Sequence, residues 1–194
     1  MPENKVQFNL KNVHYAVYTA GETHSWATPV AVPGAVKLNL DQQGSVTPFY
    51  ADGIVYYQSV GNNGYSGTLE MARFVDEMLQ DVWGFTSDST AKVIVENANQ
   101  KANAFALLFQ IDGDQDEEYY CLYNCTGTRP GIVASTNTDV KTPQTQSSTI
   151  SAVPIPSGMV FARTTAETPE NVKTGWFSAV WQPSVQAAAQ AAEQ

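Results

Sequence analysis

Basic residues are scarce in this chain. Its 194 residues include 10 Lys and Arg against 19 Asp and Glu, which leaves a formal charge of −9. A nucleic-acid-binding protein needs a basic stripe that displaces the counterions of the phosphates. Docking on anionic lipid needs a similar basic patch. The charge balance therefore argues against both of these classes.

Long apolar runs are missing as well. No stretch approaches the roughly 20 apolar residues that an α-helix needs to cross a bilayer. Residues 1–5 (MPENK) lack the basic-then-apolar order of a secretory signal. We expect a soluble protein that is made in a cytoplasm and has no membrane partner.

The chain has two cysteines, Cys121 and Cys125, in a segment patterned as a strand. At about 3.3 Å per residue their Cα atoms would lie about 13 Å apart, whereas a disulfide needs less than about 7 Å. A metal site would need further ligands at close spacing, and both histidines are distant in sequence. We therefore expect two free, buried or half-buried thiols.

Catalytic patterns are not found. His14 and His24 have no serine or cysteine nucleophile motif beside them. Residues 61–64 (GNNG) lack the lysine that follows a phosphate-binding glycine loop. Asp76 and Glu77 fall on a predicted helix surface, where solvated charges are a simpler interpretation than glycosidase acids. We predict neither an enzyme nor a cofactor.

One acidic cluster resembles the start of a calcium-binding loop. Residues 112–118 (DGDQDEE) contain five carboxylates. An EF-hand needs glycine at the sixth position and glutamate at the twelfth, where this chain has Glu117 and Tyr123. Because the flanking segments are patterned as strands, we favour an acidic hairpin tip that keeps the chain soluble over a calcium site.

What the chain does have is strand patterning and turn chemistry. Val36, Leu38 and Leu40 alternate with polar residues, which is typical of a half-buried strand. Asp52 and Gly53 suit the positive φ angles of a tight hairpin turn. The predicted strands cover 13–18, 36–41, 46–50, 54–59, 65–73, 92–95, 103–111, 118–125, 148–153 and 158–163, with 176–181 as a final candidate.

Helical and extended segments complete the prediction. Apolar spacing predicts a helix at 75–83 that ends at Gly84. A second helix is expected with Thr168 as N-cap and Pro169 at the first helical position. Two long segments, 20–34 and 129–148, are rich in Pro, Gly and polar residues and are predicted to be loops or arms. We expect one β domain at 1–183 and an Ala/Gln-rich tail at 184–194 that frays unless it docks.

Five segments occur in a recognisable order along the chain: 13–17 (VHYAV), 28–36 (TPVAVPGAV), 49–57 (FYADGIVYY), 62–70 (NNGYSGTLE) and 123–130 (YNCTGTRP). Together they resemble the major tail protein family, the tail tube proteins of siphophages and prophages of Gram-positive bacteria. The resemblance covers most of residues 8–165 in order. It departs from the family at the helix start in 74–78 and is weak beyond about 165.

The resemblance implies a mainly β fold, an antiparallel β-sandwich or half-barrel with one packed α-helix and extended loops and arms. It implies stacked, hexameric rings that form the non-contractile tail tube of a virion, through which DNA is ejected without specific binding. The implied partners are other copies of the chain and the tape-measure, tail tip or distal tail, and tail terminator proteins. The residues expected in contacts between subunits are Gly21, Trp26, Pro33, Arg129, Pro130 and Thr142.

Acidity is consistent with such a tube, because acidic residues on its wall would repel passing DNA. Asp41, Asp52 and Glu70 are our candidates for the lumen. A second interpretation is a secreted or displayed β-sandwich that binds a surface or a carbohydrate, since aromatic side chains can stack on sugars. A third is a small hydrolase that uses Asp or Glu, for which no constellation was found.

Overall fold

The computed structural model describes residues 4–19, 24–136, 139 and 141–183. It is mainly β and antiparallel, as the sequence predicts. The helices are α1 (Asp76–Trp83) and α2 (Glu170–Gly175). The strands are β1 (Gln7–Thr19), β2 (Ser25–Trp26), β3 (Val30–Ala31), β4 (Ala35–Gln43), β5 (Val46–Ala51), β6 (Ile54–Val60), β7 (Gly64–Met71), β8 (Thr86–Ser87), β9 (Ile94–Val95), β10 (Phe105–Gly113), β11 (Glu117–Gly127), β12 (Gln146–Ala152) and β13 (Phe161–Arg163).

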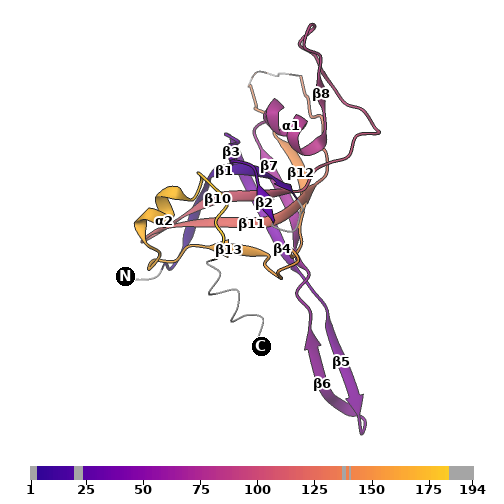
Figure 1. Ribbon diagram of the computed structural model, residues 1–194, viewed down its shortest axis with the longest axis vertical. Coiled ribbons are helices and arrows are strands. Elements are labelled where there is room, and N and C mark those ends of the chain that lie inside the picture. The colour runs from indigo at the N-terminus through magenta and orange to yellow at the C-terminus, as the bar shows by residue number, and fades with distance from the viewer. Residues whose placement is uncertain (1–3, 20–23, 137–138, 140, 184–194) are drawn as a thin grey trace.

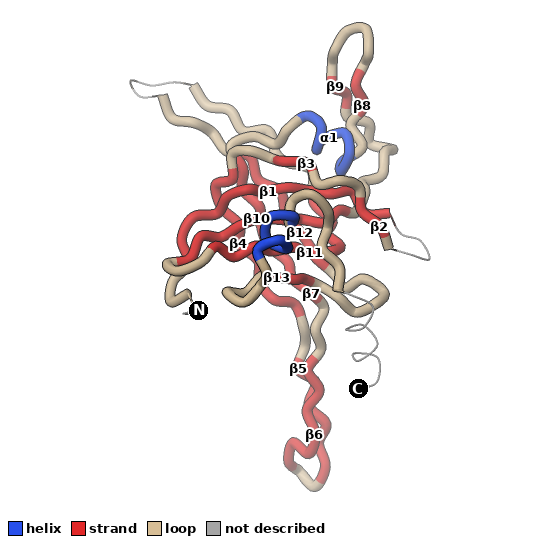
Figure 2. Tube along the Cα trace, turned by 60° about the vertical axis from the view of Figure 1, so that its left-hand side comes forward, coloured by secondary structure: helices blue, strands red, loops and turns tan. Residues whose placement is uncertain are grey.

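Nine strands form one curled sheet that does not close into a barrel (Figures 1 and 2). Its order is β2-β1-β10-β11-β12-β7-β4, with β3 paired to β1 and β13 paired to β11. This sheet and the two helices are called the body below. The β5–β6 hairpin forms a separate two-stranded ribbon that projects from one end of the body (Figure 1).

The central strands are buried on both faces, so the sheet separates two cores. In β10, Phe105, Leu107 and Phe109 belong to the first core, while Ala106 and Leu108 belong to the second. This split follows from the alternation of side chains along a strand. The first core also contains residues of α1, and the second contains residues of the segment that includes and follows α2.

Helix α1 covers one end of the curled sheet (Figure 1). It buries Met78, Val82 and Trp83 in the first core. Gly84 ends the helix in the left-handed conformation, with φ of 71°. The predictions of a strand in 65–73, a helix in 75–83 and a glycine cap are confirmed. The hydroxyl of Tyr15 also donates a hydrogen bond of 2.8 Å to Asp81 and so fastens α1 to β1.

The C-terminal part of the fold corrects two predictions. Pro169 is the N-cap residue of α2, and the hydroxyl of Thr168 accepts a hydrogen bond from the backbone N–H of Thr165 instead of capping the helix. The predicted strand at 176–181 is wrong, because this segment forms turns. Trp176 is anchored by its indole N–H, which donates to the carbonyl of Tyr120, and burial in the second core does not require strand pairing.

The two long segments differ in outcome. Within 24–34, two short strands add to β1, so this part is less loop-like than predicted. The described residues of 129–145 contain neither a helix nor a strand and are mostly exposed, as predicted. The last three residues of the predicted segment 129–148 belong to β12 instead, because they pair with β7. The tail at 184–194 lies outside the described residues.

Candidate functional site

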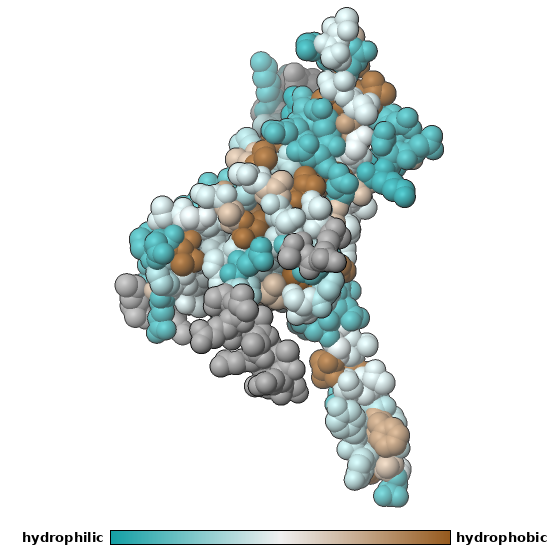
Figure 3. Space-filling view, viewed as in Figure 1, coloured by the Kyte–Doolittle hydropathy of each residue, from teal (hydrophilic) through white to brown (hydrophobic). Residues whose placement is uncertain are grey.

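The β5–β6 hairpin with its flanking residues, 44–62, is called the arm. It extends well clear of the body in Figures 1 and 2, and Figure 3 shows hydrophobic residues on its surface. Asp52 is the only charged residue in this stretch. Exposed fractions of its eight large apolar side chains run from 48% to 75%. They are Val46, Phe49, Tyr50, Ile54, Val55, Tyr56, Tyr57 and Val60.

The base of the arm is a close crossing of two chain segments. The N–H of Gly61 donates to the carbonyl of Ser45, and the N–H of Asn63 donates to the carbonyl of Gln43. A Cβ on Gly44 would lie 2.1 Å from the carbonyl oxygen of Gly61. Glycine is therefore required at position 44 for the two strands to leave the body this close together.

The tip of the arm is the predicted tight turn. Asp52 and Gly53 have φ angles of 53° and 78°. Positive φ at both central residues is the signature of the hairpin turn that matches strand twist. The structure therefore places Asp52 at the outer end of the arm, far along the ribbon from Asp41 and Glu70.

Asp41 and Glu70 share one polar face of the sheet. Register pairs place Asp41 opposite Ser66, and Glu70 opposite both Lys37 and Ser147. The Thr145 hydroxyl donates to the Glu70 carboxylate at 2.6 Å. Directly paired residues project from the same side of an antiparallel sheet. The face is lined by Lys37, Asn39, Asp41, Ser66, Thr68, Glu70, Ser147, Thr149 and Ser151.

An uncharged apolar groove opens on the opposite, inner side of the same strands. Its volume is about 270 Å³. Tyr65 and Phe161 meet there edge to face, with ring centroids 5.7 Å apart. Gln7 is the one polar lining residue, and the others are Leu38, Leu40, Tyr65, Phe109, Ile111, Tyr120, Leu122 and Phe161.

The acidic segment 112–118 forms the predicted tip of the β10–β11 hairpin, and basic side chains hold it. Lys11 forms ion pairs with Asp112 at 2.8 Å and with Glu117 at 3.0 Å. The amine of Lys173 lies 2.5 Å from Asp116. Hydrogen bonds from Lys11 hold the pKa values of Asp112 and Glu117 below their usual range.

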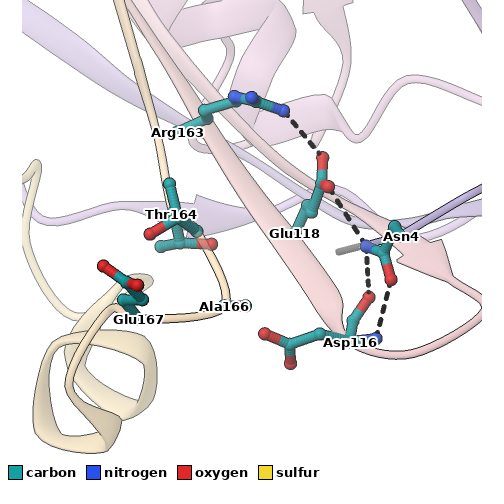
Figure 4. Close-up of a pocket in the computed structure, with 8 residues that line it drawn as sticks. Asn4, Asp116, Glu118, Arg163, Thr164, Ala166 and Glu167 are labelled. Carbon is teal, nitrogen blue, oxygen red and sulfur yellow. Dashed lines mark hydrogen bonds and ion pairs between the residues drawn. The ribbon is translucent and has the colours of Figure 1, made fainter. Parts of the chain in front are cut away.

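Asn4 fastens the chain's N-terminal segment to this tip. Its side-chain oxygen accepts hydrogen bonds from the N–H groups of Gln115 and Asp116, and its amide donates to the carbonyl of Asp116 and the carboxylate of Glu118. Figure 4 shows Asn4 between these two acids, with Arg163 on the other side of Glu118. They line a polar cavity of about 350 Å³.

The tip is thus an intramolecular clasp, and we use this name for Asn4, Lys11, Lys173 and residues 112–118. Its acids are already bound by cations and N–H groups of the same chain. No three His, Cys, Asp or Glu side chains in the described ranges form a group that could hold a metal ion. Sequence reasoning missed Asn4, Lys11 and Lys173, because partners about 60 to 110 residues away leave no local pattern.

The residues expected between subunits are scattered. Trp26 is half-buried and donates its indole N–H to the carbonyl of Tyr123. Arg129 forms an ion pair with Glu96 of the same chain. Pro33 and Thr142 are exposed, and Pro130 is half-buried. Gly21 lies outside the described residues.

The remaining sequence candidates serve packing. Cys121 and Cys125 are free and fully buried on β11, as expected. Burial raises the pKa of the Cys125 thiol to about 12. His14 stacks on Phe177 with ring centroids 4.4 Å apart. No helix in the described part of the chain is long and apolar enough to cross a membrane.

Comparison with known proteins gives no further guide. Neither a protein-family model nor a curated protein sequence matches the chain.

Proposed function

We propose that this chain is a structural subunit that polymerises with copies of itself into the tail tube of a siphophage or prophage. The observation that carries the proposal is the arm, an almost uncharged ribbon with eight large apolar side chains in water. A folded monomer gains nothing from such a ribbon, and a large exposed apolar surface marks a site of association.

Electrostatics favour the arm as the contact. Two copies that each carry a charge of −9 repel one another over most of their surfaces. The arm brings one carboxylate, that of Asp52, into a contact. The groove beside β4 and β7 contains no charged lining residue. Arm and groove are therefore two surfaces on which copies can approach without repulsion.

The arrangement of these surfaces suits an open polymer. The arm leaves one end of the body, while α1 and the β8–β9 hairpin lie at the other end (Figure 1). A contact between two different surfaces is head-to-tail, and such contacts produce rings or filaments. The stacked hexameric rings that the sequence resemblance implies combine the two, because each ring is closed and the stack of rings is a filament.

The polar face that contains Asp41 and Glu70 is our candidate for the wall of the tube. Its uncharged Ser, Thr and Asn side chains offer DNA no cation, and its two carboxylates outnumber Lys37. A wall of this kind lets the phosphate backbone pass without binding. Asp52 does not lie on this face, so the proposal for the lumen now depends on the other two acids.

The test is assembly of the purified chain over a wide concentration range. Sedimentation velocity should show growth from monomers to large particles, and negative-stain microscopy should show rings or hollow tubes. A chain that stays monomeric up to millimolar concentration would contradict the proposal. Binding of glycans by that monomer would instead favour the adhesion module, because the four exposed aromatic rings of the arm can stack on sugars.

A further inference from the structure

The β4–β7 pair of the body continues into the β5–β6 pair of the arm, and the two strand pairs differ in where their apolar side chains lie. In the body, β4 and β7 pair with an apolar side, which contains Leu38 and Leu69, and a polar side, which contains Asn39 and Thr68. Beyond the glycine crossing the chain continues as β5 and β6, and the strand pair no longer has one apolar and one polar side. The arm has apolar side chains on both of its faces.

Register assigns the arm residues to their faces. Val46 pairs with Val60, and Tyr50 pairs with Val55, so these four side chains share the first face. Phe49 pairs with Tyr57, and Ala51 with Ile54, so these share the second face. Alternation along β5 separates the two sets, and the register shift between Phe49 and Tyr50 accommodates Tyr56.

Neither face is covered by the body. On the first face, Tyr50 is 64% exposed and Val60 is 75% exposed. On the second, Phe49 is 60% exposed and Tyr57 is 63% exposed. The four aromatic side chains of the arm together offer about 500 Å² to a partner, since a fully buried aromatic removes about 150–250 Å² from water. With the four aliphatic residues the arm approaches the ~800 Å² that each partner contributes to a standard interface.

We infer that each arm is held between two other copies of the chain, one on each face. This inference depends on the proposed function, because it requires copies to associate. One flat partner can cover one face of a ribbon and leaves the other in water. In a dimer, one face of an arm would be covered and its other face would stay exposed to water. Assembly should therefore pass from monomer to a multi-subunit particle with little dimer between them.

Paired variants that alter one face at a time test this inference. Tyr50→Thr with Val60→Thr changes the first face, and Phe49→Thr with Tyr57→Thr changes the second. Threonine favours strands, so the hairpin is kept. Matched controls on the same faces are Gln58→Thr and Ser59→Thr, which remove no apolar side chain. Tryptophan emission reports that the body is folded, because Trp83 and Trp176 are buried there.

We expect both face variants to raise the concentration needed for assembly by about tenfold or more, since aromatic residues dominate such contacts. The controls should assemble like the unaltered chain. A photo-crosslinking residue at position 50 should be joined to a different surface segment of the partner than one at position 57. Normal assembly of either face variant, or one shared crosslinked segment, would overturn the inference while leaving the proposed function intact. An unaltered chain that never assembles would overturn both.

Discussion

The β10–β11 and β5–β6 hairpins differ in whether their outer side chains find partners within the same chain. The β10–β11 hairpin ends in five carboxylates, and residues of the same chain bind them: Asn4, Lys5, Lys11 and Lys173. The β5–β6 hairpin ends in one carboxylate and carries apolar side chains that nothing in the described chain covers. The side chains of the first hairpin find their partners within a monomer, whereas the apolar side chains of the second can be buried only against another molecule.

The difference shows which interactions respond to which condition. The clasp is electrostatic and lies within one chain, so pH should affect it and protein concentration should not. The arm is apolar and lies between chains, so concentration should affect it strongly. Removing each hairpin's interactions in turn would separate the stability of the fold from the stability of the assembly.

Removal of the arm should have the largest effect. We expect replacement of residues 46–60 by Asn-Gly to raise the concentration needed for assembly by about a hundredfold or more, because the apolar contact is lost. The free energy of unfolding of the monomer should stay within about 0.5 kcal/mol of its original value, since the body buries none of these side chains. Sedimentation velocity and urea unfolding measure the two quantities. A large loss of monomer stability would show that the arm belongs to the body's core.

Loss of Asn4 from the clasp should have the next largest effect. Asn4→Ala leaves the N–H groups of Gln115 and Asp116 without their acceptor, and we expect the free energy of unfolding to fall by about 1 to 2 kcal/mol. Urea unfolding measures this change. Gly113→Ala should act similarly, because its Cβ would lie 2.1 Å from the Asn4 side chain. Asn9→Ala is the matched control, since Asn9 makes one exposed hydrogen bond to Asp112. Equal losses for Asn4→Ala and Asn9→Ala would contradict the clasp.

Acid should weaken the clasp within a defined pH window. Hydrogen bonds from Lys11 hold the pKa values of Asp112 and Glu117 below normal, and the N–H of Lys5 does so for Asp114. A carboxyl group with a lowered folded-state pKa stabilises the fold above its unfolded pKa, about 3.9 for Asp and 4.3 for Glu. That stabilisation is lost as the pH falls through the folded-state value.

We therefore expect the tip carboxylates to leave stability unchanged from pH 7 to about pH 5 and to lower it below about pH 4. Urea unfolding at each pH measures the curve. Lys11→Met should make the acid decline shallower, because Asp112 and Glu117 lose the hydrogen bonds that lower their pKa values. The chain without its arm should keep the original curve, and a changed curve there would argue against separate roles for the two hairpins.

The smallest effect on stability is expected at the polar face. Asp41 is exposed, so Asp41→Lys should change the free energy of unfolding by less than about 0.5 kcal/mol and leave assembly intact. If this face lines the tube, the added cation should bind phosphate and slow DNA ejection from assembled particles. Asp41→Asn is the control that removes charge without reversing it. Unchanged ejection by the lysine variant would remove this face from the lumen.

Local patterns were sufficient for much of the architecture. The alternation in β4, the turn at Asp52 and Gly53, and the helix that ends at Gly84 each depend on residues close together in sequence. Such features follow from backbone sterics and side-chain periodicity, which act over a few residues. The burial of Cys121 and Cys125 was expected, but strand periodicity does not explain their placement: a register shift in the β10–β11 pairing puts the two thiols in different cores.

Other features depend on contacts between distant segments. The segment at 176–181 has strand-like composition, yet Trp176 is held by Tyr120 in a turn. Arg129 pairs with Glu96, a residue 33 positions away in the sequence. Each outcome depends on which segment the fold brings near, and a local pattern contains no information on that choice.

The chain's composition and periodicity therefore set its β-rich character, its acidic surface and the positions of its turns, because these depend on neighbouring residues. The tertiary structure decided that one hairpin is fastened by Asn4 while the other stands apart as an arm with two apolar faces. That decision depends on which surfaces the curled sheet can cover. The body covers both faces of β10, whereas the arm extends beyond the glycine crossing and its side chains stay exposed.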